Sequence, residues 1–440
     1  MSCLTGQNLL GNLHWVFQML DVTTLFLIFS GIVFLGFILN ALFYKLKILV
    51  TLPLMIIGVL IGPIFHLIVP QGSSILLDIA SLVSSIAIAF ILFDVGLRID
   101  ISELELFKSI RFFLPLAIAT GLVLGIIIGL LTGWSPLLSL IIGFALAGPS
   151  SAVFPTLSKI AKINVRLNNL LVFESVASDS VQLIIPLILI TLIQTNTISL
   201  SGVATSVFYF FVLSSILGVI SAFIWTFILQ AFHDYSKEYS WMLTITLVIA
   251  NYGVAQFLGL NGAVTVFVFG IMFSNLPKLF KSFDKYFYNV RPEFSHITEY
   301  QKEITFFIST FFFVYIGAIL SFNTGAFSLW YIFLIGIIIS ITILIIRRLS
   351  LPVLEEFFVR KDKKSSERIL STFDIARGLS PIIIALLLVS SSIPIDTNAV
   401  LGLIFISVFL TNVIESIGIF FYAGAANKEQ RDDTVNFKNE

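Results

Sequence analysis

The sequence predicts an all-α membrane protein with about thirteen transmembrane helices, each formed by an apolar run of about 20 residues, the length that crosses a bilayer core. The chain is 58% hydrophobic and only 11% charged, with a mean hydropathy of +1.05. Its Lys and Arg residues gather at alternate ends of the apolar runs. Apolar surface of this extent cannot be hidden in a soluble core, so the chain is expected to cross a membrane many times.

The expected segments follow one another with short connections, none of them long enough for a soluble catalytic domain. Their bounds are 23–44, 48–69, 75–97, 110–132, 136–157, 168–194, 203–230, 239–259, 261–276, 303–321, 327–357, 370–391 and 397–425. Residues 1–22 lack the basic region of a cleaved signal and are expected outside the membrane. Residues 23–425 form the predicted transmembrane domain, and residues 426–440 are polar and expected to be a disordered cytoplasmic tail.

The distribution of positive charge predicts the orientation. All 25 Lys and Arg residues except Arg377 lie in or beside the connections that follow odd-numbered segments, or in the tail. By the positive-inside rule the N-terminus is outside and the C-terminus cytoplasmic, which requires an odd number of crossings. We therefore expect a multi-pass protein of the plasma membrane. The zero net charge argues against nucleic-acid binding, and the single cysteine, Cys3, against a disulfide framework or cysteine metal site. No cofactor is expected.

Charged residues inside the apolar segments are candidates for function, because each costs a few kcal/mol or more in a bilayer. They are Asp94, Glu174, Asp179, Arg347, Arg348, Asp374, Arg377 and Glu415. Glu174 and Asp179 lie five residues apart on one helix, so their directions diverge by about 140°. One is expected to bind a substrate charge and the other to pair with an arginine.

The substrate role is expected for Asp179, because no basic residue is local to it. Ser175 lies four residues earlier on the same face, where its hydroxyl can add to a carboxylate site. Glu174 is expected to form a structural ion pair with Arg347, with Arg348 as the alternative partner.

Asp94 lies near Arg98, and its role stays open between a cation ligand and an interfacial ion pair. Asp374 and Glu415 are expected to be structural. His66 is a lone histidine at a helix end, interpreted as a polar tip.

Two predicted helices are interrupted. The segment 136–157 contains Ala147-Gly148-Pro149, and the segment 370–391 contains Arg377-Gly378-Leu379-Ser380-Pro381. Proline removes a backbone donor and glycine loosens the turn before it. Two such segments that enter from opposite sides predict an inverted-repeat transporter with its site where they cross.

At this crossing, the backbone near Ala147 can offer carbonyl oxygens to a cation. The half-helix dipoles need compensation, which Asp374 and Arg377 are placed to supply. The supporting residues of the crossing are therefore expected to be Pro149, Asp374, Arg377 and Gly378.

Several stretches together resemble sodium/proton antiporters of the cation:proton antiporter-1 type, the NhaP-like group. Residues 174–179 resemble the Glu-Ser-x-x-Asn-Asp signature, and residues 91–97 resemble the end of the third helix, where an acid contributes to the cation site. Residues 347–351 resemble the Arg-x-Leu-Gly-Val motif, whose Arg pairs with the signature Glu. Arg377-Gly378 matches the second crossing helix, and residues from 261 onward resemble the segment before the large cytoplasmic loop. The resemblance extends over nearly all of 23–425.

The resemblance implies a homodimer formed through a scaffold of residues 23–97 and 203–321, against which a core of residues 110–194 and 327–425 moves. It implies an Na⁺ site built from Asp179, Asp94, Ser175, Ser178 and the backbone of Ala147, with Li⁺ and K⁺ as alternative cations. Oxygen ligands of this kind suit Na⁺ or Li⁺. Two positions depart from the family pattern: Ser178 replaces the signature Asn, and Gly148 replaces the acid of a Thr-Asp-Pro motif.

The expected function is exchange of one monovalent cation for one proton, because a lone buried carboxylate cannot release one without taking the other. With one titrating carboxylate the exchange is predicted to be electroneutral. The alternative is a sodium-coupled symporter of a small organic solute on a similar fold, which needs a cationic midplane pocket rather than an acid. A channel would need a filter repeat, and an intramembrane enzyme would need a catalytic pair that the segments lack.

Overall fold

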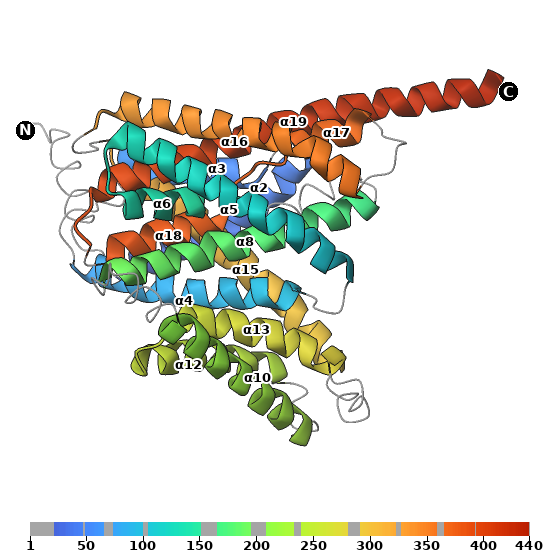
Figure 1. Ribbon diagram of the computed structural model, residues 1–440. Helices are drawn as coiled ribbons and strands as arrows, with labels where there is room; N and C mark the ends of the chain where they lie inside the picture. The colour runs from blue at the N-terminus through green and yellow to red at the C-terminus, as the bar shows by residue number, and fades with distance from the viewer. Residues whose placement is uncertain are drawn as a thin grey trace, which may run out of the picture.

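In a computed structural model, the described residues are 22–46, 49–65, 74–99, 104–150, 165–194, 208–232, 239–279, 291–322, 327–358, 365–391 and 393–439. Within these ranges the ordered elements are all helical (Figure 1). The expected all-α fold is confirmed. His66 and the N-terminal segment lie outside the described residues.

The helices of the first half match the predicted segments closely. They are α2 (Val22–Leu46), α3 (Thr51–Val59) with its extension η1 (Leu60–Ile64), α4 (Ser74–Arg98), α5 (Leu104–Thr132), α6 (Pro136–Ala145) and α8 (Val165–Gln194). Local chemistry explains where α6 begins, since the Ser135 side chain accepts a hydrogen bond from the backbone N–H of Leu138 and Pro136 occupies the first turn. Helix α6 ends at Ala145, just before the predicted interruption.

The second half contains η2 (Phe208–Leu213), α10 (Ser214–Ala231), α12 (Ser240–Phe257), α13 (Gly262–Leu279), α15 (Arg291–Ala318), α16 (Leu329–Phe358), α17 (Ser365–Phe373), α18 (Leu379–Ser390) and α19 (Thr397–Asn439). Asn261 caps α13 by accepting hydrogen bonds from the backbone N–H groups of Ala263 and Val264, at 3.0 and 3.2 Å. Asp396 caps α19 by accepting one from Ala399 at 3.1 Å. The predicted interruption of segment 370–391 is present as the non-helical residues 374–378 between α17 and α18.

Two expectations about element ends were wrong. The polar tail is not disordered, because α19 continues to Asn439 and projects away from the helical body (Figure 1). A helix that is already nucleated extends at little cost through residues such as Ala, Lys, Glu and Gln, and no Pro interrupts the tail. Helix α15 begins at Arg291 rather than near 303. Between 297 and 302 only Ile297 and Gln301 are buried, one turn apart on the same face, so an apolar-run criterion misses this part of the helix.

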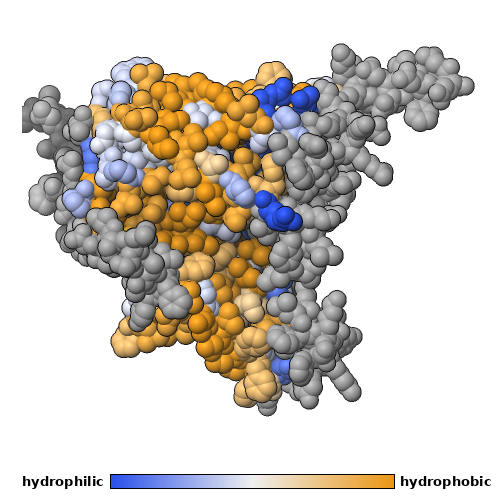
Figure 2. All heavy atoms as spheres, in the orientation of Figure 1, coloured by the Kyte–Doolittle hydropathy of each residue, from blue (hydrophilic) through white to orange (hydrophobic). Residues whose placement is uncertain are grey.

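The lengths and surface of the helices fit a membrane. Among the described residues, five helices are long and apolar enough to span a bilayer: 111–132, 170–194, 211–231, 329–352 and 397–425. The face in Figure 2 is broadly hydrophobic, with hydrophilic residues mainly toward the two ends of the helices. Large apolar side chains such as Phe227 and Leu130 are exposed, as expected for residues that meet lipid.

The helices pack as two groups. In one, α5 lies against α6 and α8, and α19 packs on α16, α17 and α18; α18 also contacts α6 and α8. In the other, α13 contacts α4, α10 and α12, and α15 packs on α3 and α4. Small residues allow close approach in the second group, where a Cβ on Gly96 of α4 would lie only 3.0 Å from Gly270 of α13. Helix α18 reaches α4 and α15, so it lies at the boundary between the groups.

Candidate functional site

The two interruptions meet in the middle of the first helix group. The backbone N–H of Ser150, after α6, donates a hydrogen bond to the carbonyl of Ala376, between α17 and α18, at 3.1 Å. Residues more than 200 positions apart therefore satisfy each other's backbone where neither helix can. The crossing of interrupted helices that the sequence predicts is present.

Glu415 of α19 supports this crossing. Its Oε2 accepts hydrogen bonds from the backbone N–H of Ile375, at 3.1 Å, and from that of Ala376. These two donors lie just before the N-terminus of α18, where a negative charge is favoured. Asn412, one turn earlier on α19, donates to the carbonyl of Arg377 at 2.8 Å. Helix α19 thus satisfies both kinds of backbone group exposed by the interruption.

Glycine permits the crossing to close. A Cβ built on Gly148 would overlap the Ser178 side chain, and one on Gly378 would overlap Ser150. The two positions at which the sequence departs from the family pattern, Gly148 and Ser178, therefore face each other. A residue larger than glycine at 148 has no room beside Ser178 in this arrangement.

Arg347 connects the two acids on either side of it. Its Nη1 forms an ion pair with Glu174 Oε1, and its Nη2 lies 3.4 Å from Asp374 Oδ2. Its Nε donates to the carbonyl of Ser371 at 2.6 Å. The contact between Glu174 and Arg347 is the predicted one. Arg348, the alternative partner, is exposed on another face of α16, whereas Arg347 is buried.

Asp179 lies on a different face of α8, as the helical spacing predicts. Its side chain is only 3% exposed, and its Oδ1 accepts a hydrogen bond from the Ser380 hydroxyl at 3.3 Å. Ser380 is the second residue of α18, so the carboxylate lies near a helix N-terminus, which favours its charged form. Ser175 is fully buried and donates to the carbonyl of Leu171 at 2.9 Å, so it can offer only lone pairs to a ligand.

Asp94 is placed in another set of contacts. Its Oδ2 lies 2.5 Å from Arg98 Nη2, one turn later on α4. The interfacial ion pair that the sequence left open is therefore formed in this conformation. A role for Asp94 as a cation ligand requires this pair to open.

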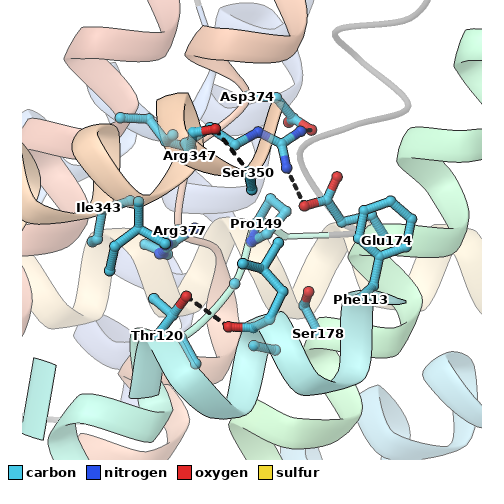
Figure 3. Close-up of a pocket in the computed structure, with 16 residues that line it drawn as sticks. Phe113, Thr120, Pro149, Glu174, Ser178, Ile343, Arg347, Ser350, Asp374 and Arg377 are labelled. Atoms are coloured by element: carbon cyan, nitrogen blue, oxygen red, sulfur yellow. Dashed lines mark hydrogen bonds and ion pairs between the residues drawn. The ribbon is translucent and has the colours of Figure 1, made fainter. Parts of the chain in front are cut away.

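A small cavity lies at the crossing, lined by residues of α5, α8, α16 and both interruptions (Figure 3). Its volume is about 30 Å³. The charged residues that line it are Glu174, Arg347, Asp374 and Arg377, and Ser178 and Ala147 also contribute. Asp179 and Ser175 are not among the lining residues, so the expected cation ligands divide between two faces of α8.

A second cavity, of about 370 Å³, lies between the two helix groups. Its lining comes from the ends of α8 and α18 on one side and from α4, α12 and α13 on the other. Polar lining residues include Thr191, Gln194, Gln256 and Asn261. Within the described residues no cluster of three His, Cys, Asp or Glu side chains could hold a tightly bound metal.

Sequence reasoning missed three contributors to the site. Ser380 was assigned no role beyond its place in an interrupted segment. Its position two residues into α18 could have identified it as a partner for Asp179. Asn412 was hidden in an apolar helix without a charge to mark it. Gln182, fully buried, reaches the carbonyl of Pro149 at 3.5 Å and was likewise unmarked.

Two interrupted helices that cross beside a buried carboxylate define a membrane transporter, and comparisons with known proteins identify the family. The family model for the transmembrane part of sodium/hydrogen exchangers matches residues 26–424. The chain belongs to the sodium/hydrogen exchanger family. It is therefore a multi-pass membrane protein that exchanges cations for protons.

Solved structures of the sodium proton antiporter MjNhaP1 from Methanocaldococcus jannaschii share the fold. One, determined at pH 8, has a TM-score of 0.72 and 18% identity, covering 92% of this chain and 97% of that one. Another, from electron microscopy, has a TM-score of 0.68 and 18% identity, covering 93% and 98%. No curated protein matches the chain.

Proposed function

We propose that this exchanger carries one monovalent cation, Na⁺ first with Li⁺ and K⁺ as alternatives, in exchange for one proton, and that both bind at Asp179. The observation that carries this proposal is the placement of Asp179: a buried acid at the N-terminus of α18, hydrogen-bonded to the Ser380 hydroxyl. A carboxylate in this position needs a proton or a cation whenever it moves through the low-dielectric interior. The family assignment favours antiport over the symporter alternative.

The cation would be held by oxygen ligands around Asp179. Ser380 can rotate its hydroxyl so that a lone pair replaces the hydrogen bond it donates to the carboxylate. Ser175 offers a lone pair from the same face of α8. Ser178, the carbonyl of Ala147 and Asp94 complete the set that the family resemblance implies, and Asp94 would join only after leaving Arg98.

Alternating access is proposed to occur by movement of one helix group against the other. The core comprises residues 110–194 and 327–425, and the scaffold residues 23–97 and 203–321. The cavity of about 370 Å³ at their boundary supports this division, because both groups line it. Its lining residue Leu187 lies about 12 Å along α8 from Asp179, at 1.5 Å per residue. By the positive-inside argument this cavity faces the outside.

The Glu174–Arg347 pair and the crossing residues Pro149, Asp374, Arg377 and Gly378 are proposed as structural support. Arg347 forms ion pairs with both Glu174 and Asp374, and the crossing residues are proposed to keep the two interruptions in register. The proposal also includes a homodimer formed through the scaffold. The protein is proposed to lie in the plasma membrane with its C-terminus in the cytoplasm.

The replacement Asp179→Asn tests the assignment. Asparagine keeps the size and can still accept a hydrogen bond from Ser380, but it can neither be titrated nor balance a cation. We expect exchange in proteoliposomes, followed with a pH-sensitive dye, to fall to the protein-free background.

A matched control is Asp396→Asn, which makes the same chemical change at the cap of α19, where asparagine caps equally well. It should exchange at the wild-type rate. Normal exchange by folded Asp179→Asn would mean that another acid carries the ions.

A further inference from the structure

The proposed function assigns no occupant to the small cavity at the crossing. Two of its lining residues carry polar atoms that are fully buried and have no hydrogen-bond partner among the described residues: Arg377 Nε, Arg377 Nη1 and Glu174 Oε2. Arg377 is 2% exposed and is among the largest fully buried side chains of the molecule. An unsatisfied polar group of this kind costs about 1–3 kcal/mol, and more when it is charged.

Arg377 and Glu174 line the cavity from different sides. Figure 3 shows Arg347 between Asp374 and Glu174 on one side of the cavity, with Arg377 beside Ile343 and with Thr120 and Ser178 at its base. The Thr120 hydroxyl already donates to the carbonyl of Leu116 at 2.8 Å, and the Ser350 hydroxyl to that of Arg347 at 2.9 Å. These hydroxyls therefore do not donate to Glu174.

The charge of the lining selects the occupant. Two carboxylates, Glu174 and Asp374, face two guanidinium groups, Arg347 and Arg377, so the formal charges cancel. An added cation would meet both arginines, and an added anion both acids. A neutral molecule that accepts hydrogen bonds from Arg377 and donates one to Glu174 meets neither penalty.

We propose that this cavity is a built hydration site, holding one or two ordered water molecules that connect Arg377 to Glu174. A water needs about 10–15 Å³ of such space and two to four polar partners, and the cavity has about 30 Å³. The water accepts from Arg377 Nε or Nη1 and donates to Glu174 Oε2. It thereby joins the second interruption to α8 without a direct contact between the two side chains.

This cavity adjoins the site proposed for the transported cation, because Ser178 and Ala147 line it. Asp179 does not line the cavity, and the occupant is neutral. The two arginines and two acids that hold this occupant are not among the proposed cation ligands, so its presence does not depend on which ion the protein carries.

Radiolytic hydroxyl labelling of the full-length protein in detergent or nanodiscs tests it, because side chains that touch bound water are oxidised even when they are buried. Phe113 lines the cavity and is 1% exposed, whereas Phe273 is 0% exposed in an aromatic cluster of the scaffold. We expect Phe113 to be labelled well above Phe273, which should remain at background. Equal background labelling of both residues would overturn the proposal.

A pair of variants on α5 gives a second measurement. Ala117→Val adds two methyl groups at the cavity wall and should displace the water, abolishing the labelling of Phe113 and lowering the melting temperature because Arg377 loses its solvation. Thr120→Val keeps the volume and removes a hydroxyl that is bonded within its own helix, so it should leave labelling intact. Labelling of Phe113 that persists in folded Ala117→Val would contradict a water in this cavity. If that variant does not fold, the comparison of Phe113 with Phe273 in the unmodified protein still decides.

Discussion

Two acids five residues apart on α8 have different surroundings, and this difference separates their roles. Glu174 forms an ion pair with Arg347 inside the crossing, whereas Asp179 contacts the Ser380 hydroxyl at the start of α18. The helical spacing alone predicts that the two side chains diverge. The charged residues inside the apolar segments predict that one of the two acids meets an arginine. The sequence does not decide between Arg347 and Arg348, because neighbouring residues on a helix differ by about 100° in direction and only one of them can face the acid.

We predict that Glu174→Ala destabilises the protein more than Asp179→Asn does. Removing one partner of a buried ion pair leaves an uncompensated charge, which costs about 3–5 kcal/mol. Asparagine at 179 leaves no such charge and keeps an acceptor for Ser380. Melting temperatures of the two purified variants, measured in the same detergent, check the order. The reverse order would exchange the roles of the two acids.

Ser380 offers a test of cation binding itself. In Ser380→Ala the Asp179 carboxylate loses the hydrogen bond that it accepts from the Ser380 hydroxyl. If the lost hydrogen bond contributes about 1.4 kcal/mol, the affinity becomes tenfold weaker. We expect the cation concentration for half-maximal exchange to rise roughly tenfold with a smaller change in maximal rate. Ser380→Thr keeps the hydroxyl and should restore affinity. If alanine and threonine variants both bind like the unmodified protein, Ser380 is not a ligand.

At the scale of elements, the crossing depends on groups contributed by a third helix. Helix α19 supplies Glu415 to the exposed N–H groups and Asn412 to the carbonyl of Arg377. The sequence predicts where helices are interrupted, because Gly and Pro mark the positions. It does not reveal which distant side chain satisfies the released backbone groups, because that depends on the packing of helices far apart along the chain.

Glu415 therefore provides a graded test of the crossing. Glu415→Leu leaves the buried N–H of Ala376 without its acceptor, which costs about 1–3 kcal/mol, whereas the N–H of Ile375 keeps the carbonyl of Phe373. Glu415→Gln retains an acceptor and loses only the charge. We expect the melting temperature to fall in the order unmodified protein, Gln variant, Leu variant. Equal melting temperatures for all three would show that this carboxylate does not support the interruption.

Element ends were predicted less well than element positions. Apolar runs located the helices because burial in lipid requires them, and caps such as Asn261 fixed some first turns. The runs missed the polar first turns of α15 and the extension of α19, because a helix outside the hydrocarbon needs no continuous apolar sequence. Backbone propensity, rather than hydropathy, controls the length of a helix there.

At the scale of the whole molecule, the fold could be predicted from the sequence and the coupling of its parts could not. Apolar segments, alternating positive charge and two interruptions together indicated a crossed-helix transporter, which the family match confirms. The division into two helix groups follows from which helices touch, as does the cavity between them. The pairing of Asp94 with Arg98 also emerges only in three dimensions, since the sequence was equally compatible with a place in the cation site.

We propose that one carboxylate, Asp179, exchanges one cation for one proton. Because Ser178, the residue beside it, does not ionise, this proposal predicts that no net charge moves in a cycle. In proteoliposomes with opposing cation and proton gradients, net flux should be zero when the cation concentration ratio across the membrane equals the proton concentration ratio. A valinomycin/K⁺ clamp of the membrane potential should not move this balance point. A second exchanged proton would shift that balance by about 2.3 kcal/mol per 100 mV. A balance point that moves with potential would contradict the claim and would make a second acid, with Asp94 the first candidate, part of the cycle.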